Sequence, residues 1–104
     1  MMPIVWTDPA IDDLQGIVDY IGRNSAVYAQ DLARGVIASV DRLAEFPESG
    51  RHVPEAGDPR IREVIHGNYR VVYWTKRGSV EILAVIHGAR DMKRMRPRPW
   101  NRRS

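Results

Sequence analysis

The sequence contains no cysteine, and this absence excludes several classes of protein. Without thiols the chain can form neither a disulfide framework nor a thiolate metal site, and it fits a reducing compartment. No apolar run reaches the roughly 20 residues that a bilayer span needs. Residues 1–6 have neither the basic region nor the long apolar stretch of a signal peptide. We therefore expect a cytoplasmic protein with no membrane contact, no metal site and no cofactor.

Acidic residues are almost absent from the end of the chain, which makes the charge uneven. Residues 1–87 hold 9 Lys/Arg and 12 Asp/Glu, a net charge of −3. Residues 88–104 hold 7 Lys/Arg and only Asp91, a net charge of +6. Pro97 and Pro99 interrupt this basic stretch, so residues 92–104 are predicted to be an extended, mobile tail with few contacts to the core. Such a tail indicates a nucleic acid or an acidic protein as its partner.

Two segments repeat apolar residues at the helical period. The first starts at Asp8-Pro9, a capping residue followed by the residue that best suits a first helical turn, and runs to about residue 21. The second is predicted over 26–44, and Phe46 is expected to anchor the turn that follows it in the core. Because only a few residues join the two segments, they should form an antiparallel helical hairpin.

Four short runs rich in β-branched and aromatic residues predict strands, at 4–6, 60–66, 68–75 and 80–87. The last two are apolar at nearly every position, which is typical of strands covered on both faces. Tyr73 and Trp74 are therefore expected in the core rather than stacked on a base. The predicted fold is α+β, of order β-αα-βββ, with an antiparallel meander sheet and the helical hairpin on one face. It forms a single domain over 1–91, followed by the basic tail 92–104.

The order of these elements and several of their residues resemble the RelE/ParE superfamily, the toxins of bacterial type II toxin–antitoxin modules. The likeness covers about residues 4–91. Each stretch alone is a weak signal, but the ordered set is specific. The stretches are Trp6-Thr7-Asp8-Pro9-Ala10, Leu43-Ala44-Glu45-Phe46-Pro47-Glu48-Ser49-Gly50-Arg51, Asn68-Tyr69-Arg70-Val71-Val72-Tyr73 and His87-Gly88-Ala89-Arg90-Asp91.

The superfamily divides by mechanism. RelE-like members cut mRNA on the ribosome with a set of basic residues, and the resemblance would place Arg70 and Arg90 in that set, with His87 available as a base. The strand that carries lysines in those nucleases here contains Glu63, which would repel a phosphate, and the tail has no tyrosine. The ending 87–91 is the form seen in ParE-like members, which inhibit DNA gyrase. The resemblance thus implies a non-catalytic gyrase inhibitor; a RelE-like endoribonuclease acting on the ribosome and mRNA is the alternative.

Structural roles are also open to these residues. Arg70 can form an ion pair with Glu81 or Asp91 that orients the strand ends, and this role suits a ParE-like protein best. Asp91 beside Arg90 likewise favours a fixed turn contact. A toxin fold that has lost its activity is a third, simpler reading of the chain.

The resemblance also supplies the partners. A cognate antitoxin would silence the toxin, and its C-terminal segment is expected to wrap the helical hairpin and an edge of the sheet. DNA gyrase is the second partner, and the basic tail is the surface expected to reach it. Trp100 has no core to join from the sequence alone, so it is expected to be the apolar anchor of that contact. The predicted target-binding residues are Arg90, Lys93, Arg94, Arg96, Arg98 and Trp100.

Overall fold

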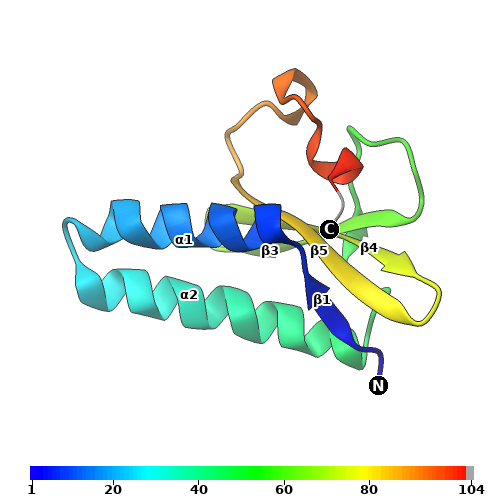
Figure 1. Ribbon diagram of the computed structural model, residues 1–104, viewed down its shortest axis with the longest axis horizontal. Coiled ribbons are helices and arrows are strands. Elements are labelled where there is room, and N and C mark those ends of the chain that lie inside the picture. The colour runs from blue at the N-terminus through cyan, green and yellow to red at the C-terminus, as the bar shows by residue number, and fades with distance from the viewer. Residues whose placement is uncertain (103–104) are drawn as a thin grey trace.

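The computed structural model of the protein describes residues 1–102 (Figure 1). Its α-helices are α1 (Asp8–Gly22) and α2 (Ala26–Asp41), and single 3-10 turns lie at Arg42–Ala44, Met92–Arg94 and Pro99–Asn101. Its strands are β1 (Ile4–Trp6), β2 (Arg51–His52), β3 (Ile61–His66), β4 (Tyr69–Lys76) and β5 (Ser79–His87). Residues 103 and 104, the end of the predicted basic tail, lie outside the described residues.

The strands of residues 1–102 form one mixed sheet in the order β1-β5-β4-β3-β2. β3, β4 and β5 make the predicted antiparallel meander, and β1 lies parallel to β5 at one edge. β2 holds the other edge through only two residue pairs, Arg51 with Glu63 and His52 with Arg62. The predicted α+β fold is confirmed, and β2 is a short strand in addition to the four that the sequence predicted.

Thr7 fixes the junction between β1 and α1. Its hydroxyl donates to the C=O of Ile82 (2.7 Å) and accepts from the N–H of Ala10 (3.3 Å), so one oxygen ties the strand end to β5 and caps the helix. The sequence suggested Asp8 as the cap. Asp8 is instead the first helical residue, where its negative charge is favourable next to the helix N-terminus.

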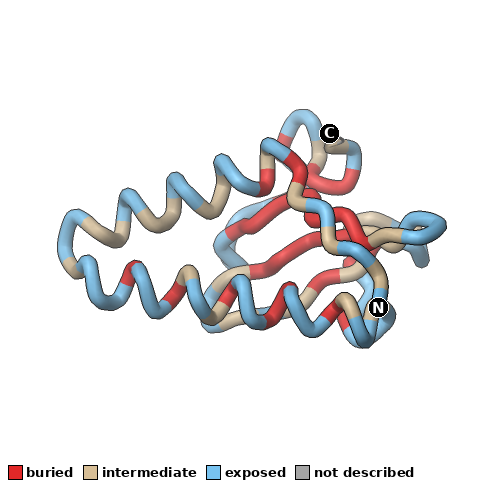
Figure 2. The backbone as a smooth tube through the Cα atoms, turned by 60° about the horizontal axis from the view of Figure 1, so that its bottom comes forward, coloured by how far each residue is buried: buried red, intermediate tan, exposed pale blue. Residues whose placement is uncertain are grey.

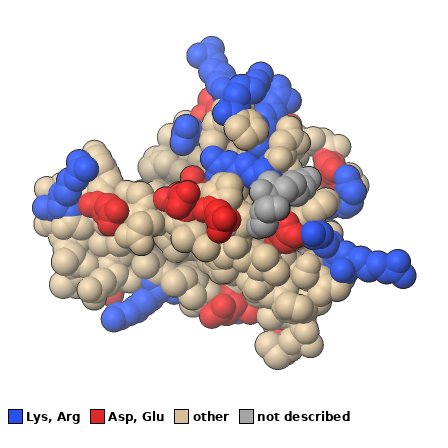
Figure 3. Space-filling view, viewed as in Figure 1, with Lys and Arg blue, Asp and Glu red and all other residues tan. Residues whose placement is uncertain are grey.

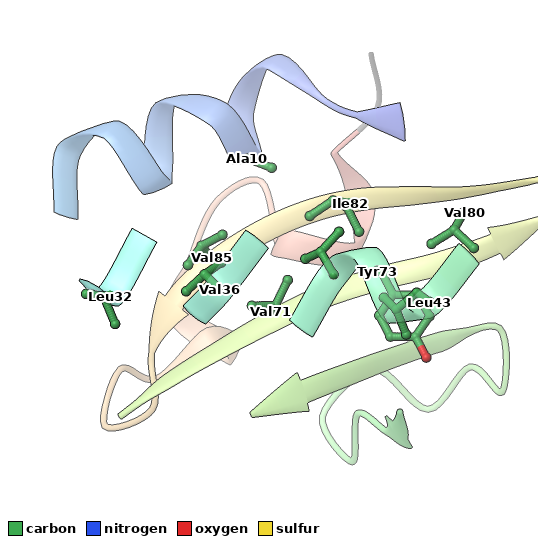
Figure 4. Packing of buried hydrophobic residues seen from close by; sticks show 10 residues of the cluster. Ala10, Leu32, Val36, Leu43, Val71, Tyr73, Val80, Ile82 and Val85 are labelled. Carbon is green, nitrogen blue, oxygen red and sulfur yellow. The ribbon is translucent and has the colours of Figure 1, made fainter. Parts of the chain in front are cut away.

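The helical hairpin closes a first core against one face of the sheet (Figures 2 and 4). Buried positions run along the strands and along the sheet-facing side of α2, as the helical period predicted. Ile37, an apolar residue of the segment 26–44 that repeats at the helical period, is instead exposed on the outer side of the hairpin. The buried residues of this core are Ala10, Leu32, Val36, Val40, Leu43, Val71, Tyr73, Val80, Ile82 and Val85.

Tyr73, and not Phe46, anchors the turn after α2. The Tyr73 hydroxyl donates to the C=O of Pro47 (2.9 Å) and accepts from the N–H of Gly50 (3.0 Å). A Cβ on Gly50 would lie 2.5 Å from that hydroxyl, so the close approach requires glycine. Phe46 is 57% exposed, and the expectation that it enters the core was wrong. Tyr73 takes the place in the core that was expected for Phe46, because its ring is buried while its hydroxyl forms hydrogen bonds with two backbone groups of the turn.

The C-terminal segment covers the opposite face of the sheet (Figure 1), so the prediction of an extended, mobile tail was wrong. Met92, Met95 and Trp100 are only 0%, 7% and 8% exposed, and they complete a second core. The physical reason is that this face of β4 and β5 is apolar and has no helix to cover it. The other members of the second core are Val53, Ile61, Val72, Leu83, Ala84 and Ile86.

A charged contact ties the end of this segment back to the first layer. The guanidinium of Arg102 donates to the carboxylate of Asp13 (2.6 Å), and the same oxygen accepts from the backbone N–H of Val85 (3.0 Å). Asp13 therefore joins α1, β5 and the C-terminal segment. No helix within residues 1–102 is long and apolar enough to cross a bilayer.

Candidate functional site

The end of the sheet at which β4 begins and β5 stops brings together part of the predicted site. Tyr69 pairs with His87 across the two strands, and their rings meet edge to face with centroids 5.4 Å apart. Because successive strand residues point to opposite faces, Arg70 faces away from both rings. An open hollow of about 550 Å³ lies at this end. Among residues 1–102, no group of three or more His, Asp or Glu side chains is placed to hold a metal ion.

Arg70 is occupied by two carboxylates. Its Nε donates to Glu63 Oε1 (2.6 Å), and its Nη2 donates to Glu63 Oε2 (3.1 Å). Its Nη1 and Nη2 also donate to the two oxygens of Glu55 (2.8 and 2.9 Å). The Glu63 side chain is 0% exposed and also accepts from Arg51 Nε (2.7 Å). We call Arg51, Glu55, Glu63 and Arg70 the charged cluster; its formal charges sum to zero.

Arg70 therefore forms ion pairs, as its structural reading required, but with partners other than those that the sequence suggested. The sequence suggested Glu81 or Asp91 as the carboxylate. Glu81 instead accepts from the indole of Trp74 and the ammonium of Lys76, and Asp91 accepts from the backbone N–H of Lys93. The hydrogen bonds that Arg70 donates to Glu55 raise the pKa of Arg70 above its usual value, and those that it donates to Glu63 add to this. A guanidinium bound in this way has little donor capacity left for a phosphate.

Glu55→Gln is expected to weaken the fold most near neutral pH. Hydrogen bonds from Arg70 lower the pKa of the Glu55 carboxyl from 4.5 to about 2. The ionised carboxylate therefore stabilises the fold fully above about pH 4.5, and this contribution is lost as the pH falls towards 2. Because Glu55 is partly exposed, we expect about 1–2 kcal/mol. Urea unfolding at about pH 7 and about pH 2.5 should show a difference between the two proteins that shrinks in acid.

The control for this measurement is Glu48→Gln, which removes an exposed carboxylate from the turn before β2. It is expected to change the free energy of unfolding little at either pH. A Glu55→Gln effect of equal size at both pH values would show that the ion pair with Arg70 does not contribute.

His87 is the last residue of β5 and Arg90 lies in the turn that follows, and both side chains are exposed. The Nδ1 of His87 accepts from the backbone N–H of Ala89 (3.1 Å), so neutral His87 carries its proton on Nε2. The Arg90 N–H donates to the C=O of His87 (3.0 Å), which fixes the turn through backbone atoms. The three residues of the predicted nuclease set are thus neighbours in space, and Arg70 and His87 line the same hollow, but the guanidinium of Arg70 is neutralised by Glu55 and Glu63.

The tail residues predicted to bind a target divide into two groups. Trp100 is buried in the second core, which corrects the reason for which it was singled out. The four cations between Met92 and Trp100 instead lie outward on the C-terminal segment, with Arg98 less exposed than the others. We call Lys93, Arg94, Arg96 and Arg98 the basic ridge.

Comparison with known proteins identifies the family. The model of the ParE toxin of the type II toxin–antitoxin system, parDE, matches residues 4–92. The chain belongs to the ParE toxin family. A toxin of Caulobacter vibrioides named RelE2 is 38% identical over 91 residues, covering 86% of this chain and 99% of that protein. A solved chain of the chromosomal ParDE system of P. aeruginosa has the same fold, with a TM-score of 0.69 at 22% identity, over 84% of this chain and 96% of the other.

Family membership makes the protein the toxin of a type II module within the RelE/ParE superfamily, as its sequence motifs suggested. Toxins of such modules bind a cognate antitoxin, so a partner protein is part of its function. The names ParE and RelE both occur among these relatives. The choice of target therefore rests on the chemistry of the site residues.

The structure also shows a groove that the sequence did not single out. It lies on the outer side of the helical hairpin, has a volume of about 400 Å³ and is mainly apolar. Ile11 and Ile37, both exposed, lie on opposite sides of it. The signal in the sequence was Ile11, an apolar residue outside the stripe that faces the sheet. The residues lining the groove are Trp6, Ile11, Leu14, Gln15, Val18, Ala33 and Ile37.

Proposed function

We propose that this ParE family toxin inhibits DNA gyrase and does not cut RNA. The observation that carries the proposal is the charged cluster, in which Arg70 is bound by two carboxylates. Cleavage of RNA by this superfamily's chemistry needs cations free to stabilise the charge that develops on the phosphate. In this toxin the central candidate cation is already neutralised.

A phosphate could reach Arg70 only at a large electrostatic cost. It would have to displace Glu55 and then lie next to Glu63, whose carboxylate is fully buried. Two like charges about 4 Å apart repel by about 4 kcal/mol at the effective dielectric of a protein surface. Of the nuclease candidates, His87 and Arg90 remain exposed, and together they supply one base and one cation without the further cation that Arg70 would provide.

Two assays on the purified toxin test this proposal. The toxin is expected to inhibit supercoiling by gyrase in a dose-dependent manner and to leave a ribosome-bound message intact in a toeprinting assay. His87→Ala and Arg90→Ala provide the decisive controls, because both residues are exposed and their loss should not affect folding. Cleavage of the message that disappears in either folded variant would establish the alternative, a ribosome-dependent endoribonuclease. Both targets are cytoplasmic, and we propose the same compartment for the toxin.

We further propose that the antitoxin lies along the outer groove of the hairpin. An amphipathic helix with apolar residues at i, i+3, i+4 and i+7 would fill a groove of this shape, and Ile11 and Ile37 would contact it from either side. At the sheet edge, β2 pairs only with Arg62 and Glu63, so the outer edge of 64–66 remains open to an added strand. Hydrogen exchange of the toxin alone and with its antitoxin would test both contacts. Protection confined to other surfaces would exclude them.

A further inference from the structure

We propose that the basic ridge is a binding site for the phosphodiester backbone of duplex DNA. This inference deepens the proposed function, because gyrase acts on DNA, but it concerns a contact that this chain makes without gyrase. The ridge consists of Lys93, Arg94, Arg96 and Arg98 on the C-terminal segment. Lys and Arg side chains gather around this segment at the top of Figure 3.

The charges of the ridge are only weakly compensated, in contrast to those of the sheet. Lys93 lies close enough to Glu55 to help lower the pKa of that carboxyl, but the two side chains share no hydrogen bond or ion pair among the contacts of residues 1–102. On the sheet, Arg51, Arg70 and Lys76 each bind a carboxylate at 2.8 Å or less. Asp91 is the one acidic residue between 88 and 102. It lies 3.6 Å from Arg94 with both side chains exposed, and a pair of this kind is worth less than about 1 kcal/mol. The ridge therefore keeps a net positive charge.

The backbone of the ridge is fixed, because buried side chains of the same segment anchor it in the second core. Met92, Met95 and Trp100 are buried at intervals along the same segment, so the residues between them are directed outward. Arg96 Nη1 also donates to the C=O of Lys93 (2.6 Å) and of Met95 (2.8 Å), which fixes the course of the chain. A segment whose backbone is already ordered loses less conformational entropy on binding than a mobile tail does.

The composition of the ridge indicates the chemistry of its partner. Three of the four cations are arginines, whose planar guanidinium suits the two oxygens of a phosphate. Single-strand binding sites present exposed aromatic rings to stack on bases, but Trp100, the aromatic side chain within residues 92–102, is buried. The ridge thus fits a regular line of phosphates read without base contacts, as on duplex DNA.

The test is fluorescence anisotropy of a labelled DNA duplex titrated with the full-length toxin between about 50 and 200 mM salt. If the four cations each neutralise one phosphate, log K should fall with log salt with a slope of about −3 to −4. Affinity should then drop roughly 100-fold over this range. The variant Lys93→Gln/Arg94→Gln/Arg98→Gln should reduce the slope to about −1, because each cation lost removes about one unit.

The matched control is Arg23→Gln/Arg34→Gln/Arg77→Gln, which removes three exposed cations away from the ridge. The control should bind DNA almost as the wild type does, and both triple variants should keep the wild-type melting temperature. Equal loss of affinity in both variants, or no binding by the wild type at low salt, would overturn the assignment. Equal or tighter binding to duplex RNA or to polyglutamate would overturn DNA as the partner. DNA binding without gyrase inhibition would refute the proposed function and leave the ridge assignment standing.

Discussion

Truncation of the chain after Asp91 is expected to unfold the toxin. Met92, Met95 and Trp100 would be removed from the second core, and the apolar face of β4 and β5 would be left open to water. Burial of one large apolar side chain contributes about 1.5–3 kcal/mol, so the three together contribute about 4.5–9 kcal/mol. A domain of this size has a total stability of about 5–15 kcal/mol. The truncated chain is therefore expected to show no cooperative thermal transition by circular dichroism.

A single substitution tests the same contact with less disturbance. Trp100→Ala is expected to cost about 3–5 kcal/mol, because a buried aromatic side chain is replaced by a cavity. Asn101→Ala, at the exposed next residue, is the matched control and should change the melting temperature little. A truncated chain that melts as the full-length toxin does would show that the second core forms without the segment. Loss of toxicity on truncation identifies an effector surface only if the shortened chain remains folded.

The C-terminal segment was predicted to be a mobile tail because it is rich in basic residues and proline. The sequence of the two central strands, however, indicates that this segment is needed to cover the sheet. The runs 69–75 and 80–86 are apolar on both faces, and one helical hairpin can cover only one of them. The second cover had to come from elsewhere in the chain. The segment after Asp91, with Met92, Met95 and Trp100, was the available source. Prolines exclude a long helix, but they do not prevent a chain from packing through the residues between them.

The helices and the meander could be predicted because they rest on periodicity and on turn residues, which are local properties. The charged cluster could not, because Glu55 lies in the loop between β2 and β3, whose path depends on the second core. Glu63 was assigned correctly to the strand beside Arg70, but only the register shows that the two side chains share a face. The sequence indicated that Glu63 would repel a phosphate. The structure shows in addition that Glu63 forms an ion pair with Arg70, which leaves this arginine without a free charge for a phosphate.

Arg70→Met is expected to destabilise the toxin by about 3–5 kcal/mol, because it removes one partner of a buried ion pair. Glu63 has a fully buried side chain and would keep only Arg51, which is itself 62% exposed. Glu55 would lose its partner as well, but it is closer to water. The cost is thus mainly that of a buried carboxylate left without sufficient compensation.

A second substitution separates this effect from a loss of packing. Adding Glu63→Gln to Arg70→Met removes the buried charge, so the double variant should be more stable than Arg70→Met alone, with a coupling energy of about 1–3 kcal/mol. Arg34→Met is the control. It breaks an exposed pair with Asp31 at 3.9 Å and should cost less than about 1 kcal/mol. The measurement is urea unfolding at neutral pH.

The same series decides how activity data at Arg70 are to be interpreted. In a nuclease, Arg70→Met would abolish toxicity even when the fold is intact, and Glu63→Gln could not restore it. In the proposed gyrase inhibitor, toxicity should follow stability, so the double variant should recover part of what the single variant loses. Arg70→Met with the stability of Arg34→Met would contradict the ion-pair network. A stable but non-toxic Arg70→Met would return Arg70 to the catalytic role.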